Sequence, residues 1–399
     1  MTRSLTSKIR KLVYENDRWR KECLNLNAAE SALIDDKISN LLISDLNRRA
    51  VLGTPGDRYS EGYRYIDEIE RVLDKLLKKL FNSRFSEWRP LSASVADGII
   101  IHALTSVGDR IVATPSPLGH PTWHENGYAG FRGLKIVDLP IEWESMEIDY
   151  DRVEKLNQNN KFTLAIEGRS LIMFPPDFRK LRDALGDVPL WYDGAHVMGL
   201  IASHLFPNPL DYGFAVLSGS TQKTFSGPVG GIILTNDSKT ISSIRIATSN
   251  DTATPDYGRI AALASTCSEW VKKGETFGSM IVRNAKALAE SLTANGIAVL
   301  HEEKGFTETH QVAMLSPNGL SAKKTASKLA VANIITTPFP MPDGKGGTRE
   351  ILRLGTTELT EKGLKTDQMQ DVAGAINLAL SDTTKAIERV KSIVRDLKE

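Results

Sequence analysis

Cysteine is almost absent from the 399 residues: only Cys23 and Cys267 occur, outside any C-x-x-C or zinc-finger spacing. This scarcity predicts free thiols in a reducing compartment and no disulfide framework. The chain also lacks an apolar N-terminal leader, and charged residues interrupt every apolar run before about 18 residues, the length that a membrane-spanning helix needs. These absences predict a cytoplasmic protein that does not enter a membrane.

Neither sign of charge is in excess, since 50 basic residues face 49 acidic ones and the net charge is +1. The chain therefore has no general electrostatic field for nucleic acid or an anionic membrane, and neither partner is expected. A Walker A loop, a G-x-S-x-G elbow and a convincing G-x-G-x-x-G are also missing. The hydrophobic fraction of 41% is ordinary for a globular protein.

The length exceeds that at which a single core stops growing, so we expect more than one domain. Residues 1–60 are interpreted as an N-terminal arm, 61–257 as a large domain, and 258–399 as a linking helix with a small C-terminal α+β domain. Apolar residues at helical spacing predict a helix over 65–81. Between residues 88 and 235, short apolar runs alternate with helical segments, which indicates an α/β unit with a mainly parallel sheet. In the C-terminal part, apolar runs at 297–300, 311–315 and 351–354 predict strands, and 338–349 is the most flexible-looking loop.

Lys223 follows an apolar run at 214–217, with small residues before it and a glycine-rich turn after it. About 30 residues upstream, Asp193 ends the run Leu190-Trp191-Tyr192. Pyridoxal 5'-phosphate (PLP) requires this arrangement, because a lysine forms a Schiff base with it and a carboxylate keeps its ring nitrogen protonated. Plainer interpretations are a surface lysine and an aspartate that caps a turn.

The segment around Ser92, Ala93 and Ser94 leads into a predicted helix. A helix N-terminus offers free N–H groups to an anion, and serine hydroxyls add donors, so this segment is a candidate phosphate cradle. On this stretch alone, a serine that merely caps the helix is the more ordinary interpretation.

His120 and His124 have a metal-ligand spacing, but Pro121 disfavours helical geometry at His120 and no glutamate completes a zincin motif. We therefore expect no metal, and a flat ring over the cofactor is the better role for His120.

Arg353 is a charge within an apolar strand pattern. It is either a buried arginine for a carboxylate or an edge-strand residue that faces solvent.

Several segments match, in chain order, the motifs of one enzyme family. They are Asn27-Ala28-Ala29-Glu30-Ser31 (A-S-E-N in the family), Tyr59-Ser60-Glu61-Gly62-Tyr63 (Y-A-E-G-Y), 91–97 (H-S-G-S-x-A-N), Gly119-His120-Pro121-Thr122 (G-H-L-T), 192–200 (V-D-x-A-H-x-x-G-L), 221–228 (T-H-K-T-L-R-G-P) and Arg353-Leu354-Gly355-Thr356 (R-x-G-T). Over residues 25–380 the chain thus resembles the serine hydroxymethyltransferase family of PLP-dependent enzymes. The resemblance implies PLP fold type I (aspartate aminotransferase-like), with a mainly parallel central sheet in the large domain.

The resemblance also implies a role for each matching residue. Lys223 would be the Schiff-base lysine, Asp193 would pair with the pyridine nitrogen, and His120 would stack on the ring. His196 would lie near the cofactor's O3', and Ser92, Ala93 and Ser94 would line its phosphate. Ser220 and Gln222, beside the lysine, would complete the cofactor site. Arg353 would hold the substrate carboxylate, while Glu61 and Tyr59 would come from the neighbouring subunit of a homodimer, with Glu61 exchanging protons with the substrate hydroxyl.

The chain also departs from the family pattern. A P-G-x-R-Y-Y-G-G stretch that follows Y-A-E-G-Y is missing after Tyr63. Gln222 replaces a histidine and cannot carry a proton at neutral pH, and Val229 replaces an arginine. Ala253-Thr254 stands roughly where the family has a glycine pair that reaches the neighbour's phosphate. No convincing folate-binding stretch is found.

Our first hypothesis is a PLP-dependent lyase or transferase that acts at the Cα–Cβ bond of a β-hydroxy amino acid. It would be an aldolase, a transaldolase or hydroxymethyltransferase-like, but not a standard folate-dependent serine hydroxymethyltransferase. The alternative keeps PLP but makes the chain an aminotransferase, a decarboxylase or a condensing enzyme of a biosynthetic pathway. A third possibility is a non-enzymatic binding protein with the PLP fold. The sequence does not identify the amino acid or the acceptor aldehyde.

Overall fold

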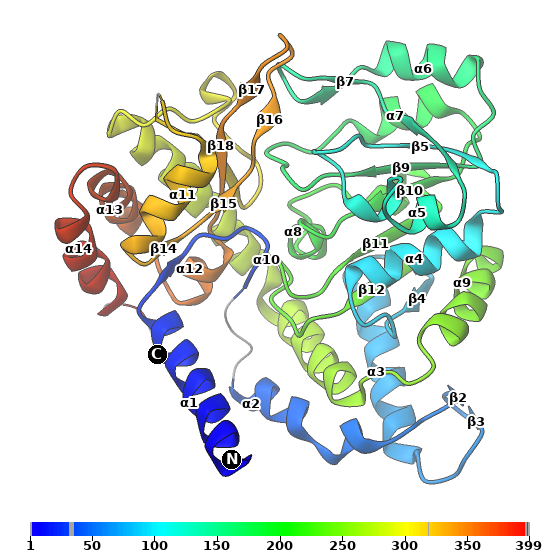
Figure 1. Cartoon of the computed structure of the whole chain (residues 1–399). Coiled ribbons are helices and arrows are strands. Elements are labelled where there is room, and N and C mark those ends of the chain that lie inside the picture. The colour runs from blue at the N-terminus through cyan, green and yellow to red at the C-terminus, as the bar shows by residue number, and fades with distance from the viewer. Residues whose placement is uncertain (1, 32–35, 318, 396, 398–399) are drawn as a thin grey trace. The chain divides into compact units, whose positions relative to one another are not determined.

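The computed structural model describes residues 2–31, 36–317, 319–395 and 397 (Figure 1). The chain forms two compact units. The larger unit consists of Leu33–Ser279 with Pro342–Gly347, and the smaller unit of Met1–Ala32, Met280–Met341 and Thr348–Glu399. This division differs from the boundaries expected at residues 60 and 257. The segment interpreted as an arm is shared between the units, and the long helix α10 (Tyr257–Ala294) spans the division.

A seven-stranded sheet forms the centre of the larger unit, in the order β4-β12-β11-β10-β9-β5-β6. The five strands from β11 to β6 are mutually parallel, while β12 runs antiparallel to both β11 and β4. The mainly parallel sheet of the prediction is thereby confirmed. The strands are β4 (Phe85–Glu87), β5 (Arg110–Ala113), β6 (Lys135–Asp138), β9 (Leu164–Gly168), β10 (Leu190–Asp193), β11 (Val216–Ser220) and β12 (Gly231–Thr235).

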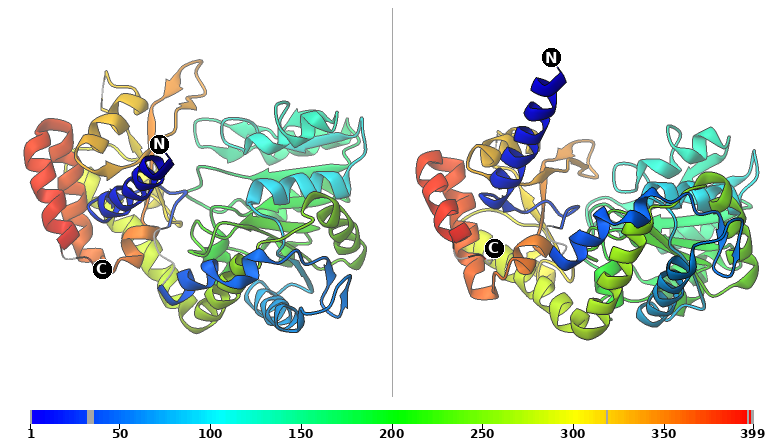
Figure 2. Two further views of the ribbon diagram at one scale, coloured as in Figure 1. Left: turned by 60° about the horizontal axis from the view of Figure 1, so that its bottom comes forward. Right: turned by 90° about the horizontal axis from the view of Figure 1, so that it is seen from below.

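Helices cover both faces of this sheet, as the views in Figures 1 and 2 show. Successive strand residues point to opposite faces. Trp191 accordingly belongs to the core on the face of α4 (Ala93–Leu104) and α9 (Ser238–Asp251), whereas Tyr192 packs edge-on against Phe178 of α7 (Phe178–Leu185). The larger unit also contains α2 (Asp36–Ser39), α5 (Tyr128–Phe131), α6 (Tyr150–Gln158), α8 (Met198–Ala202), the hairpin β2 (Gly53–Thr54) and β3 (Asp57–Arg58), and the hairpin β7 (Ile141–Glu142) and β8 (Glu147–Ile148).

Local sequence explains where these helices begin. The side chains of Asp149, Asp177 and Asp237 cap α6, α7 and α9 by accepting a hydrogen bond from a backbone N–H of the first turn. The predicted helix over 65–81 is confirmed as α3 (Arg64–Leu80), whose buried stripe includes Leu73 and Leu77. An apolar stripe at this spacing forms a helix because it can be buried only on one side.

The smaller unit is built on a three-stranded antiparallel sheet, in the order β13-β18-β15. The strand expected at 297–300 is reduced to an isolated bridge between Val299 and Met314. The loop expected at 338–349 contains paired segments. The elements are α1 (Thr2–Lys21), β1 (Leu24–Asn25), β13 (Gln311–Leu315), α11 (Ala322–Val331), β14 (Ile334–Ile335), β15 (Thr337–Pro338), β16 (Met341–Pro342), β17 (Thr348–Arg349), β18 (Ile351–Gly355), α12 (Thr357–Glu361), α13 (Met369–Ser381) and α14 (Thr383–Arg395).

Both cysteines are buried and free. The Cys23 thiol donates to the backbone oxygen of Trp19, and burial raises its pKa to about 11. Burial raises the pKa of the Cys267 thiol as well. Among the helices that the structure describes, none has the length and apolar character needed to cross a membrane.

Candidate active site

The candidate site lies at the carboxyl ends of β10 and β11. These strands are parallel neighbours, with Asp193 opposite Ser218, so the acid that ends β10 and the loop that follows β11 leave the same edge of the sheet. In open α/β sheets, ligands bind at this edge. The separation of about 30 residues between Asp193 and Lys223 in the sequence therefore corresponds to the ends of two adjacent strands.

Asp193 is held rigidly in a buried position. Its side chain is 8% exposed, and Oδ1 accepts a hydrogen bond from the backbone N–H of Ala195 at 2.9 Å. Gly168 of β9 leaves room for it, since a Cβ atom at Gly168 would lie 2.7 Å from the Cβ of Asp193. A larger residue at 168 would displace the carboxylate.

The charges around Asp193 favour a cationic partner. Burial raises the pKa of Asp193, while the neighbouring Lys223 and His120 act in the opposite direction. A buried carboxylate is stable in its charged form only when a cation compensates it. A protonated pyridine nitrogen has that charge, so the acid fits the ring of PLP, and Lys223 is close enough to influence the same carboxylate.

The segment that carries Lys223 is fixed by hydrogen bonds on both sides. The backbone N–H of Gly227 donates to the Thr221 oxygen at 2.7 Å, and Thr221 in turn donates its backbone N–H to the Gly230 oxygen at 3.0 Å. The Thr224 hydroxyl donates to the backbone oxygen of His196 at 2.9 Å, so the lysine loop is tied to the segment that follows β10. The Lys223 side chain is half-buried, which leaves part of it open to a ligand.

Other expected cofactor residues lie on this scaffold. His196 is buried, and its backbone oxygen anchors the lysine loop. Ser220 ends β11, and its hydroxyl donates to the side-chain oxygen of Gln222. The structure therefore brings these residues to the same strand ends as Asp193 and Lys223.

The segment expected to bind the phosphate forms the N-terminus of α4. Ser92 is the N-cap, and its Oγ accepts from the backbone N–H of Val95 at 3.2 Å. The cap interpretation is thus correct, but it leaves the hydroxyl proton and the N–H groups of Ala93 and Ser94 available, because the first turn of a helix has no intrahelical acceptors for them. Gly231 of β12 passes so close that a Cβ there would lie 2.3 Å from the Ser92 oxygen. The cradle is therefore packed against the sheet that holds Lys223.

His120 precedes a short 3-10 turn, Pro121–Trp123, in agreement with the expectation that Pro121 prevents helical geometry at His120. Its Nδ1 lies 2.9 Å from Oγ1 of Thr122, which lies 2.7 Å from Oδ2 of Asp97. Asp97 is 1% exposed, and the sequence interpretation did not single it out. A signal was present, because an acid within the apolar helix 93–104 has no polar face to occupy.

Tyr59 and Glu61 follow β3, and both side chains are exposed, Tyr59 to 84%. Tyr59 lines a cavity of about 640 Å³ together with Arg58, Arg89 and Ala253. Two segments expected to serve a neighbouring subunit, around residues 59 and 253, therefore border one cavity of the larger unit.

Arg353 belongs to β18, the central strand of the sheet in the smaller unit. It is 5% exposed, and its guanidinium lies over the ring of Phe339 at 5.1 Å from the centroid. Burial lowers its pKa to about 10. The interpretation as an edge-strand arginine that faces solvent is wrong, and a buried guanidinium of this kind suits a carboxylate ligand.

Within the described ranges, no group of three or more His, Cys, Asp or Glu side chains is placed to hold a metal ion. His124, four residues from His120, is partly buried, and burial lowers its pKa.

Comparison with known proteins gives one consistent family. The family model described as "Serine hydroxymethyltransferase" matches residues 4–376. The curated serine hydroxymethyltransferase of Methanothermobacter marburgensis is 35% identical over 98% of this chain and 93% of its own length. That of Thermoplasma volcanium is also 35% identical, with the same coverage, and that of Archaeoglobus fulgidus is 32% identical over 98% of this chain and 91% of its own.

Among solved structures, an L-threonine transaldolase from Pseudomonas fluorescens, crystallised in its internal aldimine state, matches with a TM-score of 0.89. The match covers 99% of this chain and 93% of the other at 24% identity, which establishes a common fold. The predicted fold class, PLP cofactor and class of enzyme are confirmed by these comparisons. The chain belongs to the serine hydroxymethyltransferase family of PLP-dependent enzymes.

Proposed function

We propose that the chain makes or breaks the Cα–Cβ bond of a β-hydroxy amino acid, as an aldolase or transaldolase that does not need folate. The observation that supports this most directly is the placement of Asp193 and the Lys223 loop at adjacent strand ends. When bound, PLP supplies an electron sink for the electron pair left on Cα. The buried carboxylate of Asp193 would keep the proton on the ring nitrogen that this chemistry needs.

The remaining residues of the larger unit would bind and orient the cofactor. Ser92, Ala93 and Ser94 would donate to the phosphate from the N-terminus of α4. His120 would lie flat against one face of the ring, and His196 would stand beside its phenolic oxygen. Ser220 and Gln222 would border the lysine. Lys223 would hold the cofactor by its side-chain amine, and the free amine would move a proton at the substrate Cα.

Substrate orientation would depend on Arg353 and Glu61. The Arg353 guanidinium, already desolvated, would hold the substrate carboxylate by two parallel hydrogen bonds. The Glu61 carboxylate would take the proton of the β-hydroxyl as the Cα–Cβ bond breaks. Because the Glu61 side chain is exposed in a single chain, we propose that it acts in the site of a second copy, together with Tyr59.

Independence from folate is supported by three departures from the family pattern. The active-site stretch after Tyr63 is missing, Gln222 replaces a histidine, and Val229 replaces an arginine. The curated relatives at 35% identity are named serine hydroxymethyltransferases, whereas the structural relative at 24% identity is named a threonine transaldolase. The direct test is therefore a comparison of turnover with and without tetrahydrofolate.

The purified enzyme should release an aldehyde from at least one of threonine, allo-threonine and phenylserine, at a rate that tetrahydrofolate does not change. A transaldolase would in addition convert threonine and an added aromatic aldehyde into a new β-hydroxy amino acid. If none of the three substrates gives an aldehyde, the Cα–Cβ assignment is wrong. Serine turnover that requires tetrahydrofolate would instead contradict only the folate-independent part.

The alternative reactions, transamination, decarboxylation and condensation, are favoured by the same Gln222 substitution, because it changes the residue beside the lysine that moves protons. An aminotransferase would convert the cofactor to its amino form when given an amino donor alone. Absence of that form, together with aldehyde release, would exclude this alternative.

Mixing two inactive variants should restore activity if a homodimer shares its sites. Lys223→Ala would remove the lysine from one copy and Glu61→Gln the acid from the other. Random pairing makes half of the dimers hybrid, and each hybrid has one intact site, so about a quarter of the wild-type activity is expected. The activity should be measured after the two variants are unfolded and refolded together. No recovery, with hybrids present by mass spectrometry, would place Glu61 in its own chain's site.

A further inference from the structure

Asp97, Thr122 and His120 form a continuous line of polar atoms in the larger unit. Oδ2 of Asp97 lies 2.7 Å from Oγ1 of Thr122, and that oxygen lies 2.9 Å from Nδ1 of His120. Asp97 comes from α4, while Thr122 and His120 come from the turn after β5. The direct separation of Oδ2 and Nδ1 is 3.7 Å, so the threonine hydroxyl is the bridge between the acid and the ring.

A single hydroxyl between two titratable groups can be oriented in two ways. If Asp97 is ionised, the Thr122 O–H donates to the carboxylate and its oxygen accepts from an Nδ1–H of His120. If Asp97 is protonated, its O–H donates to Thr122, whose own O–H then points to a bare Nδ1, and the ring carries its hydrogen on Nε2. One proton gained at the acid thus moves one hydrogen from one ring nitrogen to the other, and the backbone N–H of Thr122, 3.4 Å from Nδ1, favours the second arrangement.

We propose that Asp97 acts as a positioning residue that sets, through Thr122, which ring nitrogen of His120 carries the hydrogen. Asp97 itself need not touch the substrate or the cofactor. The role of His120 against the cofactor ring rests on the proposed function, but the coupling between the three side chains does not. The coupling is a property of this chain's own residues and exists before any cofactor is bound.

The surroundings of Asp97 allow its charge to change. Burial raises its pKa well above the ordinary range, and the negative charge of Asp193 on β10 raises it further. Thr122, Lys223 and the Ser218 hydroxyl act in the opposite direction. Its Oδ1 is buried and has no hydrogen-bond partner within normal distance among the described residues. Both a carboxyl group and a carboxylate can therefore be accommodated in this position.

His120 is the only other member of the line that titrates, and its surroundings keep it neutral. Burial lowers its pKa, as do Lys223 and His124, while Asp193 acts in the opposite direction. A neutral ring has two alternative hydrogen positions, whereas a protonated ring has none to choose between. At neutral pH the His120 ring can therefore carry its hydrogen on either nitrogen.

The residue at position 97 distinguishes this chain from the family motif. The motif that 91–97 resembles ends in asparagine, where this chain has Asp97. An asparagine can hydrogen-bond to the same hydroxyl, but it does not titrate. The aspartate therefore replaces a fixed hydrogen-bonding group with one that responds to pH and to the charge of neighbouring groups.

The test reads the His120 tautomer directly in the protein without cofactor, by correlation of ring nitrogens and carbon-bound protons in protein labelled with ¹⁵N-histidine. The chain has 7 histidines, and a His120→Gln variant assigns the signals of this one. Across roughly pH 5 to 9, the wild-type ring should change from hydrogen on Nε2 to hydrogen on Nδ1. In Asp97→Asn the ring should keep one tautomer throughout.

Two further variants separate the bridge from the acid. Thr122→Val removes the hydroxyl at constant volume and should abolish the pH-dependent change, whereas Thr122→Ser keeps the hydroxyl and should retain it. A wild-type ring that keeps one tautomer over the range, or a change that persists in Asp97→Asn, would overturn the proposal. Because no substrate is involved, these outcomes are independent of whether Cα–Cβ cleavage is found.

Discussion

Lys223→Ala is expected to abolish the visible absorption band that the bound cofactor acquires when it is joined to a lysine. Activity should fall by roughly 10⁴-fold or more, because the group that both forms the covalent link and moves the proton is removed. The protein should still fold, since Lys223 is half-buried and its loop is held by backbone hydrogen bonds that do not use the side chain. Absorption spectra and a cofactor-saturated assay measure the two effects separately.

Two control variants make this result specific. Lys223→Arg keeps a positive charge beside Asp193 but cannot form the covalent link, so it should fail in the same way while preserving the charge balance of the site. Lys272→Ala changes a lysine that is exposed and paired with Glu269, and it should have no effect. A normal spectrum in Lys223→Ala would show that another lysine holds the cofactor.

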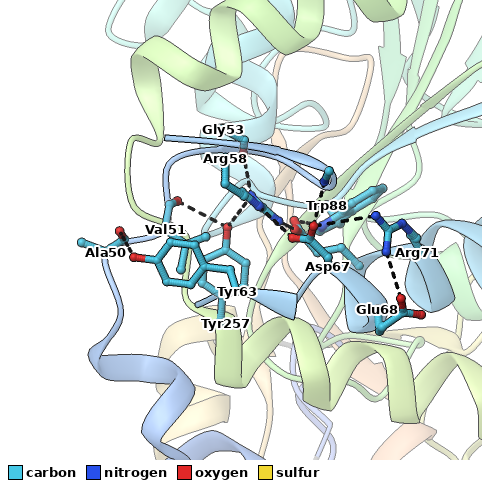
Figure 3. Close-up of polar contacts among 12 residues, drawn as sticks. Ala50, Val51, Gly53, Arg58, Tyr63, Asp67, Glu68, Arg71, Trp88 and Tyr257 are labelled. Atoms are coloured by element: carbon cyan, nitrogen blue, oxygen red, sulfur yellow. Dashed lines mark hydrogen bonds and ion pairs between the residues drawn. The ribbon is translucent and has the colours of Figure 1, made fainter. Parts of the chain in front are cut away.

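Replacing Arg58 is expected to be the most destabilising single change in the polar network of Figure 3. The Arg58 side chain is 6% exposed; its Nε donates to Asp67 Oδ1 at 2.9 Å, and its Nη2 donates to Glu70. Glu70 is buried as well and accepts from the Trp88 ring nitrogen at 3.1 Å. Arg58→Met leaves the buried Glu70 without its ion-pair partner and leaves Asp67 paired only with the half-exposed Arg71, which together costs about 3–5 kcal/mol.

The pH dependence of this loss follows from Glu70. Burial raises the pKa of Glu70 and Arg58 lowers it, so Arg58→Met should raise it further. A raised carboxyl pKa gives stability that is present below the unfolded pKa and is lost as pH rises through the folded one. The gap in free energy of unfolding between wild type and Arg58→Met should therefore narrow in acid. Urea unfolding at pH values on either side of the Glu70 titration measures this.

Arg71 is a matched control, because Figure 3 shows it pairing with the same Asp67. Half of its side chain is exposed, so Arg71→Met should cost less than about 1 kcal/mol. The double variant Arg58→Met/Glu70→Gln should recover part of the loss, because it removes one of the stranded charges. If Arg58→Met and Arg71→Met lower the free energy of unfolding equally, burial does not explain the contribution of the Arg58 ion pairs.

The network around Arg58 anchors the β2–β3 hairpin, which precedes Tyr59 and Glu61. Disrupting this network should therefore also lower activity.

The sequence predicted most of the larger unit because its signals are local. Apolar runs and turn residues give the parallel strands, and a strand end followed by an acid or a small-residue loop gives Asp193 and Lys223. The helix that begins after Ser92 has a capping residue and an apolar body, so both its start and its burial could be read from the sequence.

The parts that escaped prediction depend on tertiary packing. Asp97 stands out in the sequence as an acid within an apolar helix, but its neighbours Thr122 and Asp193 could not be assigned, because they come from segments far apart in the chain. Arg353 could be assigned to a central strand only once the order β13-β18-β15 was known. The run at 297–300 has strand composition, but only Val299 finds a bridge partner. Contributions from a second copy, proposed for Glu61 and Tyr59, lie beyond any single chain's pattern.

The buried thiols have a practical consequence for spectroscopy. A reagent that attacks thiolates finds neither Cys23 nor Cys267 in a reactive form, because both are covered and their pKa values are raised. A cysteine introduced on the surface, for instance at the exposed Val107, would then be modified alone. Fluorophores or spin labels could be attached at one chosen position, without first removing either natural cysteine.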